Sequence, residues 1–153
     1  RRVDFLWRPF TATTYQRRLS GYRAALVEAG IAPSRAWEHP IDPDDLSAVR
    51  ELVDGGATDI LCVNDESAAI LMRGLEELDL HVPTDVRVVG FDDVKYARLA
   101  RVPLTTIKQP CDAIGDLAIQ GMLSRLKDPE QPPRDLLLEG ALTVRASSQR
   151  RAR

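Results

Sequence analysis

The chain is poor in cysteine, with two in 153 residues. Cys62 lies inside an apolar run and Cys111 at an expected helix start, without the Cys-x-x-Cys spacing of zinc or redox sites. Two thiols placed in this way indicate buried or incidental cysteines rather than a disulfide framework. The expected setting is therefore reducing and cytoplasmic.

Long apolar runs and a concentrated positive charge are also lacking. No stretch approaches the roughly 20 apolar residues that span a bilayer, and no signal peptide is visible, so no membrane contact is expected. The net charge is -2, and the only dense basic cluster closes the chain. Because DNA-binding domains concentrate Lys and Arg on one face, this segment is not expected to bind DNA itself. Residues 149–153 are predicted to be a disordered basic tail.

Catalytic and cofactor motifs are missing as well. The sequence has no G-x-S-x-G elbow, no G-x-G-x-x-G or Walker loop, no calcium-spaced acidic loop and no His pair at i, i+4. His39 and His81 are far apart in the sequence. We therefore expect neither an enzyme nor a metal or other cofactor, and non-covalent recognition remains.

What is present is a regular alternation of short apolar runs and helical stripes. The order predicts an α/β fold with a doubly wound parallel sheet, because right-handed crossovers place helices on both faces. The nearly continuous apolar run at 86–91 is typical of a strand buried on both faces. Strands are expected near 3–7, 36–39, 59–63 and 86–91, with helices at 14–30, 42–56 (capped by Asp42) and 66–80. A loop, a strand at 103–109, a helix at 111–128 and a closing pair of strands or hairpin at 136–147 follow.

Polar and aromatic side chains gather where the expected strands end. In parallel sheets, ligands bind outside the carboxyl ends of the strands, so these side chains are candidates for a binding site. Carboxylates accept from hydroxyls, Asn and Arg supply donors, and an aromatic ring covers an apolar sugar face. The candidates are Arg8, Pro9 and Phe10 after the first strand, Trp37 and His39 at the second, Asn64 and Asp65 after the third, and Asp92 and Asp93 after the fourth.

Each candidate also has an ordinary structural interpretation. Asn64 or Asp65 is suited to cap the helix that begins at Glu66, which leaves the other side chain free to face a ligand. Asp92 and Asp93 are suited to a turn, since Asp bonds readily to nearby backbone.

Two further side chains have alternatives of the same kind. Trp37 is more often a packing residue than a ligand platform, and Arg18 near the first helix start would be a solvated surface residue on frequency alone.

Four motifs occur in order: R-L-x-G-Y at 18–22, N-D at 64–65, V-P-x-D-V-x-V-V-G-F-D-D at 82–93 and P-L-T-T at 103–106. Together they resemble the lactose-repressor/galactose-repressor (LacI/GalR) family of bacterial transcriptional regulators. The resemblance covers roughly residues 3–148. It implies a periplasmic-binding-protein-like type I domain of two lobes with the ligand between them, of which this chain is mainly the C-terminal lobe.

The resemblance also implies roles for particular side chains. Arg18, Asn64 and Asp92 match family residues that bind the effector, which leaves Asp65 to the helix start. Trp37 stands where relatives often place an aromatic residue against the ligand, and Thr14, one helical turn before Arg18, is a weaker candidate for the same wall.

One departure concerns the first strand-to-helix loop. Relatives commonly have a small residue and Gly there, whereas this chain has Trp7 and Arg8. Arg8 is therefore a candidate to narrow the pocket or to supply a cation for an acidic effector, which argues against a plain neutral sugar.

The same resemblance indicates a fragment, since the chain starts without Met and the DNA-binding headpiece and most of the N-terminal lobe are not in it. Residues 105–126 would normally pack on that lobe, and here they should repack on their own lobe or pair with another chain. The expected function is effector sensing and dimerisation in a sugar-responsive repressor, with operator DNA bound only through the headpiece. Residues 43–54, 66–80 and 102–105 are the expected homodimer contacts. The alternative is a periplasmic sugar-binding protein of an ABC transporter.

Overall fold

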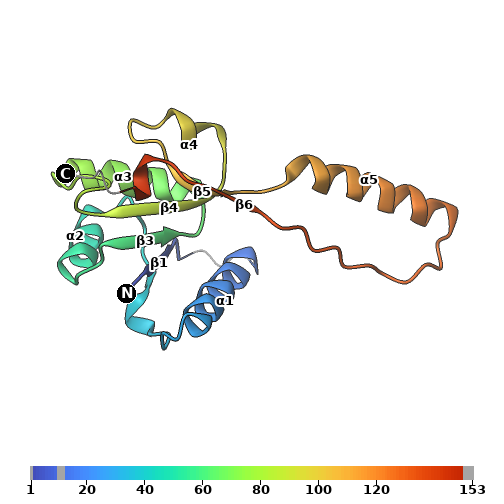
Figure 1. Cartoon of the computed structure of the whole chain (residues 1–153), viewed down its shortest axis with the longest axis horizontal. Helices are drawn as coiled ribbons and strands as arrows, with labels where there is room; N and C mark the ends of the chain where they lie inside the picture. Colours follow the sequence, from blue (N-terminus) through green and yellow to red (C-terminus); the bar gives the residue numbers. More distant parts are fainter. Residues whose placement is uncertain (1, 10–12, 150–153) are drawn as a thin grey trace.

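A six-stranded sheet forms the centre of the computed structural model, which describes residues 2–9 and 13–149 (Figure 1). The strand order is β2-β1-β3-β4-β5-β6; the first five are parallel and β6 is antiparallel to β5. The order reverses at β1, as in doubly wound sheets, so the predicted fold class is confirmed. The strands are β1 (Asp4–Trp7), β2 (Glu38–Pro40), β3 (Asp59–Cys62), β4 (Arg87–Asp92), β5 (Thr105–Lys108) and β6 (Ala141–Thr143).

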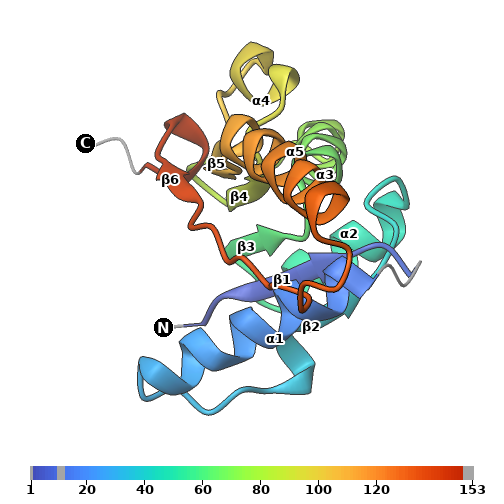
Figure 2. The same cartoon turned by 90° about the vertical axis from the view of Figure 1, so that its right-hand side faces the viewer.

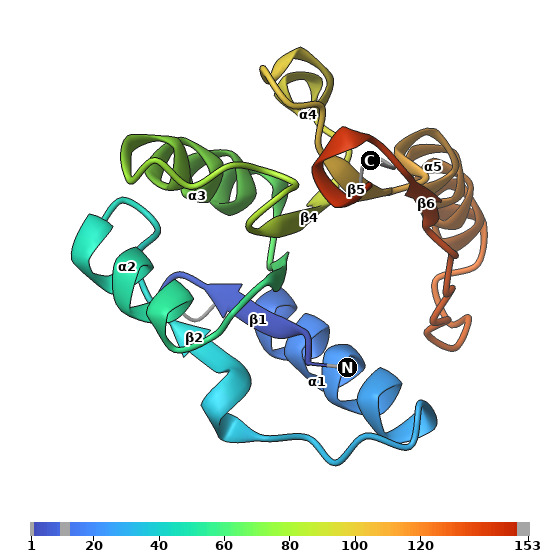
Figure 3. The same ribbon diagram turned by 60° about the vertical axis from the view of Figure 1, so that its left-hand side comes forward.

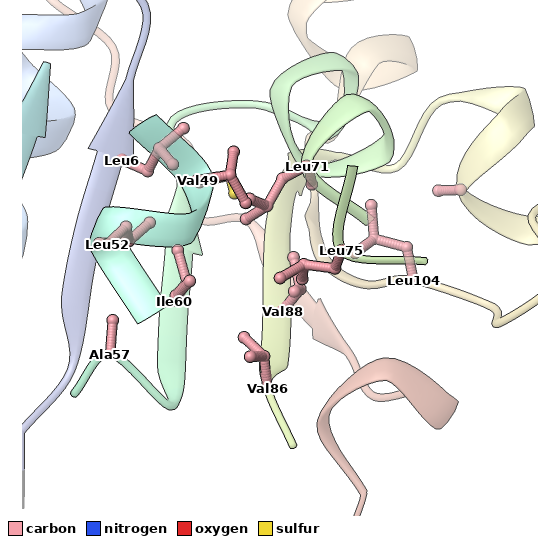
Figure 4. Close-up of a cluster of buried hydrophobic side chains, with 13 residues drawn as sticks. Leu6, Val49, Leu52, Ala57, Ile60, Leu71, Leu75, Val86, Val88 and Leu104 are labelled. Atoms are coloured by element: carbon pink, nitrogen blue, oxygen red, sulfur yellow. The ribbon is translucent and has the colours of Figure 1, made fainter. Parts of the chain in front are cut away.

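Helices cover both faces of this sheet, with α1 on one face and α2 and α3 on the other (Figure 3). Because successive side chains of a strand point to opposite faces, Phe5 packs under α1 while Leu6 joins the larger core beneath α2 and α3 (Figure 4). The helices are α1 (Thr13–Glu28), α2 (Leu46–Asp54), α3 (Asp65–Glu77), α4 (Lys95–Leu99) and α5 (Cys111–Lys127), with 3-10 turns at Arg35–Trp37 and Ala146–Ser148.

The start of α2 differs from the prediction. The cap is Asp45, whose carboxylate accepts from the N–H groups of Ser47 at 3.0 Å and Ala48 at 3.2 Å. Asp42 instead accepts from the N–H of Asp44 at 3.2 Å, within the turn before the helix. The prediction was wrong because both aspartates have suitable spacing, and only the backbone path decides which one the helix follows.

The end of the chain also departs from the prediction in two places. A short helix, α4, occupies part of the segment expected to be a loop. The closing segment forms a single strand, β6, which pairs with β5 over Thr106 to Lys108 and is not a hairpin of its own. Of the expected basic tail, residues 150–153 lie outside the described residues.

The helix α5 and the segment that returns to β6 project away from the lobe (Figure 1). Figure 2, viewed toward the outer end of this projection, shows β6 rejoining the sheet edge next to β5. No described residue of α5 is buried, and its exposed apolar side chains include Ile119, Leu123 and Leu126. The helix therefore does not repack on its own lobe, whereas β5 stays in the sheet, paired with β4. Pairing with another chain stays a prediction.

None of the helices in the described part of the chain has the length and apolar character needed to cross a membrane.

Candidate functional site

Arg18 and Asp92 meet at the carboxyl edge of the sheet, the side from which α5 projects (Figure 1). Arg18 lies on α1 and donates through Nη2 to Oδ1 of Asp92 at 3.0 Å. Its Nη1 donates to the carbonyl of Val63 at 2.6 Å, and its guanidinium lies 3.9 Å from the ring centroid of Phe91. Charge-assisted bonds and the aromatic face both stabilise the cation, so the guanidinium is held in a defined position.

The pair is partly open to solvent, with 20% of the Arg18 side chain and 25% of the Asp92 side chain exposed. It places guanidinium donors and carboxylate acceptors where a small polar molecule can reach them.

Two amide side chains also lie at this edge of the sheet. Gln109, which follows β5, donates through Nε2 to Oδ1 of Asp92. Asn64, which follows β3, donates through Nδ2 to the hydroxyl of Tyr15 on α1 at 3.3 Å. The structure therefore brings together three of the predicted residues, Arg18, Asn64 and Asp92.

Sequence reasoning missed Tyr15, Phe91 and Gln109. Tyr15 could have been found, because it precedes Arg18 by three residues and shares its helical face. Gln109 is the last residue of a predicted strand, so the rule applied to the other strand ends extends to it.

The cap of α3 is Asn64 and not Asp65, to which the family resemblance assigned the helix start. Asn64 caps α3, because its extended backbone lets Oδ1 accept from the N–H of Ser67 at 2.9 Å. Asp65 is the first residue of that helix and is fully buried, with Oδ2 accepting from the N–H of Val94 and Oδ1 from the hydroxyl of Thr106. One of the two does cap the helix, as predicted. The amide nitrogen of Asn64 still faces Tyr15, so it stays a candidate ligand.

Burial raises the pKa of Asp65, although the bonds from Thr106 and Val94 act in the opposite direction. The nearby carboxylates of Asp92 and Asp93 raise it further.

Asp92, the last residue of β4, and Asp93 form a sharp turn at the end of the strand, with φ of 123° and 56°. The turn directs their side chains to different partners: Asp92 contacts Arg18, while Asp93 pairs with Arg145 at 2.6 Å. The turn interpretation of these residues is therefore correct, and it is compatible with a ligand role for Asp92.

Trp37 does not join the site. It lies in the turn before β2, at the amino end of that strand, and packs half-buried against the core that contains Phe5 and Leu19. The packing interpretation applies because the strand begins at Glu38, one residue later than Trp37. The prediction of a ligand platform placed this side chain at the wrong end of the strand.

Arg8 lies at the carboxyl end of β1, but carboxylates already match its charge. Its Nη2 contacts Asp44 at 2.8 Å and its Nε lies 3.3 Å from Asp42. Arg8 is thus paired with two carboxylates, and its expected role toward an acidic effector stays a prediction. Thr14 is exposed in the first turn of α1, one turn before Arg18, and its predicted role stays untested.

A hollow of about 700 Å³ begins beside Arg18 and continues between α1 and the sheet. Its walls include the apolar side chains of Leu61, Val89 and Ile107. Charged side chains line it both beside Arg18 and at the starts of β3 and β4, where Asp59 and Arg87 form an ion pair.

Among residues 2–9 and 13–149, no group of three or more His, Cys, Asp or Glu side chains is placed to hold a metal ion.

Comparison with known proteins identifies the family. The periplasmic binding protein-like domain family matches residues 1–148. The ribose operon repressor of Haemophilus influenzae is 30% identical over 152 residues, which is 96% of this chain and 46% of that protein. The transcriptional regulator CelR in complex with cellobiose superimposes with a TM-score of 0.83 at 30% identity, over 97% of this chain and 47% of that one.

A third comparison involves DNA. The lac repressor dimer bound to operator and the anti-inducer ONPF superimposes with a TM-score of 0.79 at 26% identity, over 96% of this chain and 52% of that one. The chain spans less than half the length of the curated relatives it matches. The chain thus belongs to the periplasmic binding protein-like domain family and corresponds to the effector-binding part of LacI-family transcriptional regulators.

Proposed function

We propose that this lobe senses a sugar or sugar derivative within a LacI-family transcriptional repressor. The observation that carries the proposal is the partly open pair of Arg18 and Asp92 at the carboxyl edge, with Asn64 and Gln109 beside it. The ribose and cellobiose regulators support a sugar effector. Because these relatives regulate transcription, they favour a repressor over the transport protein that the fold alone would allow.

The chemistry of the site suits neighbouring hydroxyl groups. A sugar hydroxyl both donates and accepts, so adjacent hydroxyls can bridge the Asp92 carboxylate and the Arg18 guanidinium. The Phe91 ring under the guanidinium keeps Arg18 in place while its bond to Asp92 is exchanged for bonds to the effector.

Signalling would come from closure of a second lobe over this edge. An effector that contacts both lobes binds the closed state more tightly than the open state and shifts the population between them. In the whole protein that shift would alter operator affinity through headpieces that lie outside this chain. Such a protein would act in the cytoplasm.

The proposed dimer uses the side of the lobe that carries α2 and α3. The proposed contacts are residues 43–54 and 66–80, which include most of these two helices, and residues 102–105 at the start of β5. The operator-bound lac repressor dimer supports an assembly of this kind.

A thermal-shift experiment on the full-length protein tests the sensing function. D-ribose, cellobiose and their phosphates are added in turn, and the sugar that binds is expected to raise the Tm. Arg18→Ala is expected to abolish the shift, because it removes the main donor of the site.

Arg23→Ala is the matched control. It removes a guanidinium and its ion pair with Glu38 from the same helix, away from Asp92. The site assignment is wrong if binding of the best sugar survives Arg18→Ala unchanged.

A further inference from the structure

Asp65 is a wholly buried carboxylate at the start of α3, and capping of that helix does not use it. It is 0% exposed, and the cap bond to Ser67 comes from Asn64. Oδ2 of Asp65 accepts from the N–H of Val94 at 2.9 Å, and Oδ1 accepts from the hydroxyl of Thr106 at 2.5 Å. Burying an ionisable group costs free energy. Because capping of α3 does not need the Asp65 carboxylate, we expect its two hydrogen bonds to have another role.

Both bonds lead to the turn after β4. Asp92 and Asp93 have positive φ, a conformation that residues with a Cβ keep only when the surrounding structure holds them. Asp65 accepts a hydrogen bond directly from the N–H of Val94, the residue after Asp93. The hydroxyl oxygen of Thr106 accepts from the N–H of Asp93 at 3.4 Å, while its hydrogen goes to Asp65. The two amides that follow Asp92 are thus held by one carboxylate, directly or through Thr106.

Strand β4 leaves space for this carboxylate. A Cβ added at Gly90 would lie 2.2 Å from Oδ1 of Asp65. Glycine inside a strand weakens it and often marks a close approach of another group. Here that group is the Asp65 side chain, so strand, carboxylate and turn are packed as one unit.

We propose that Asp65 is a positioning residue of the effector site, which holds Val94 directly and Asp93 through Thr106 so that the Asp92 carboxylate faces Arg18. Without these bonds the turn relaxes toward negative φ, and the Asp92 carboxylate moves away from Arg18 and Gln109. The consequence for effector binding rests on the proposed function, whereas the geometry can be measured without any effector.

Amide exchange and arginine side-chain NMR on the 153-residue chain test the proposal. Thr106→Val removes the hydroxyl, and Asp65→Ala removes the carboxylate. In Thr106→Val the amide of Asp93 loses its bond to the hydroxyl, and in Asp65→Ala the amide of Val94 loses its bond to the carboxylate. The amide that loses its partner is expected to exchange about tenfold faster or more. The guanidinium signals of Arg18 should move toward those of a solvated arginine. Thr106→Ser keeps the hydroxyl and should restore both readouts.

Asp4→Asn is the matched control for a loss of stability alone. Asp4 is also 0% exposed in the same sheet, where it contacts Arg2 and His39 instead of the turn. It should speed exchange across the sheet without changing the Arg18 signals.

The proposal is overturned if Thr106→Val leaves the Arg18 signals unchanged, or if every sheet amide accelerates equally, since the carboxylate would then only support the fold. Should Asp65→Ala fail to fold, Thr106→Val and its serine rescue decide the same question.

Discussion

Replacing Gly90 by alanine probes how tightly β4 packs against Asp65. The added Cβ would meet Oδ1 of Asp65 at 2.2 Å and Cδ2 of Leu104 at 2.9 Å. The carboxylate cannot swing aside without breaking its bonds to Val94 and Thr106. Overpacking costs roughly 1–3 kcal/mol and a displaced bond to a charged group about 1.5–3 kcal/mol. We therefore expect Gly90→Ala to lower the free energy of unfolding by about 3 kcal/mol, and the Tm by roughly 6–12 °C.

Urea denaturation followed by far-UV circular dichroism measures this change, with Gly21→Ala as the matched control. Gly21 lies inside α1, and a Cβ there would meet nothing within 4 Å among the described residues. Alanine in a helix interior is more favourable than glycine by roughly 0.5–1 kcal/mol, so this variant should gain stability. The packing argument fails if Gly90→Ala lies within about 0.5 kcal/mol of the unsubstituted chain.

A double substitution separates the two close contacts. In an Asp65→Ala background the contact with the carboxylate is absent, so Gly90→Ala should cost at least about 1 kcal/mol less than it does alone. An equal cost in both backgrounds would show that Leu104, and not Asp65, limits the space at Gly90.

Two further predictions concern acid stability and association. Burial alone would raise the pKa of Asp4, but hydrogen bonds from His39 and Arg2 outweigh it and hold that pKa below its ordinary value. Asp4 therefore stabilises the fold above about pH 4, and this contribution is lost as the pH falls through the lower folded pKa. The urea midpoint should accordingly vary less between about pH 2 and pH 6 in Asp4→Asn than in the unsubstituted chain. The 153-residue chain should also self-associate through α5, where Leu123 is 50% exposed, and Leu123→Glu should weaken this in light scattering after size exclusion. A monodisperse monomer of the unsubstituted chain would contradict this expectation.

Local patterns were sufficient for the larger elements. Leu19, Tyr22 and Leu26 recur at helical spacing and form the buried face of α1, and Gly30, with φ of 73°, ends the turn that follows it. Alternation of strands and helices predicted the parallel sheet, because crossover geometry leaves few other arrangements. The family motifs named Arg18 and Asp92 as effector ligands, and the structure places the two side chains in contact.

Local patterns failed where two neighbouring residues compete for one role. Asp42 and Asp45 both suit a helix cap, as do Asn64 and Asp65, and the choice depends on backbone angles that sequence spacing does not specify. The position of Trp37 depends on where β2 begins, since a shift along the strand moves a side chain away from the ligand edge.

The sequence by itself determined the fold class and the family, because periodicity and motif order are properties of the chain alone. Only the tertiary structure decided that Asp65 is buried behind the site and that Gly90 leaves room for it. It also decided that Arg8 is matched by Asp42 and Asp44. These contacts join residues far apart in the sequence, so their geometry depends on how strands and turns pack together.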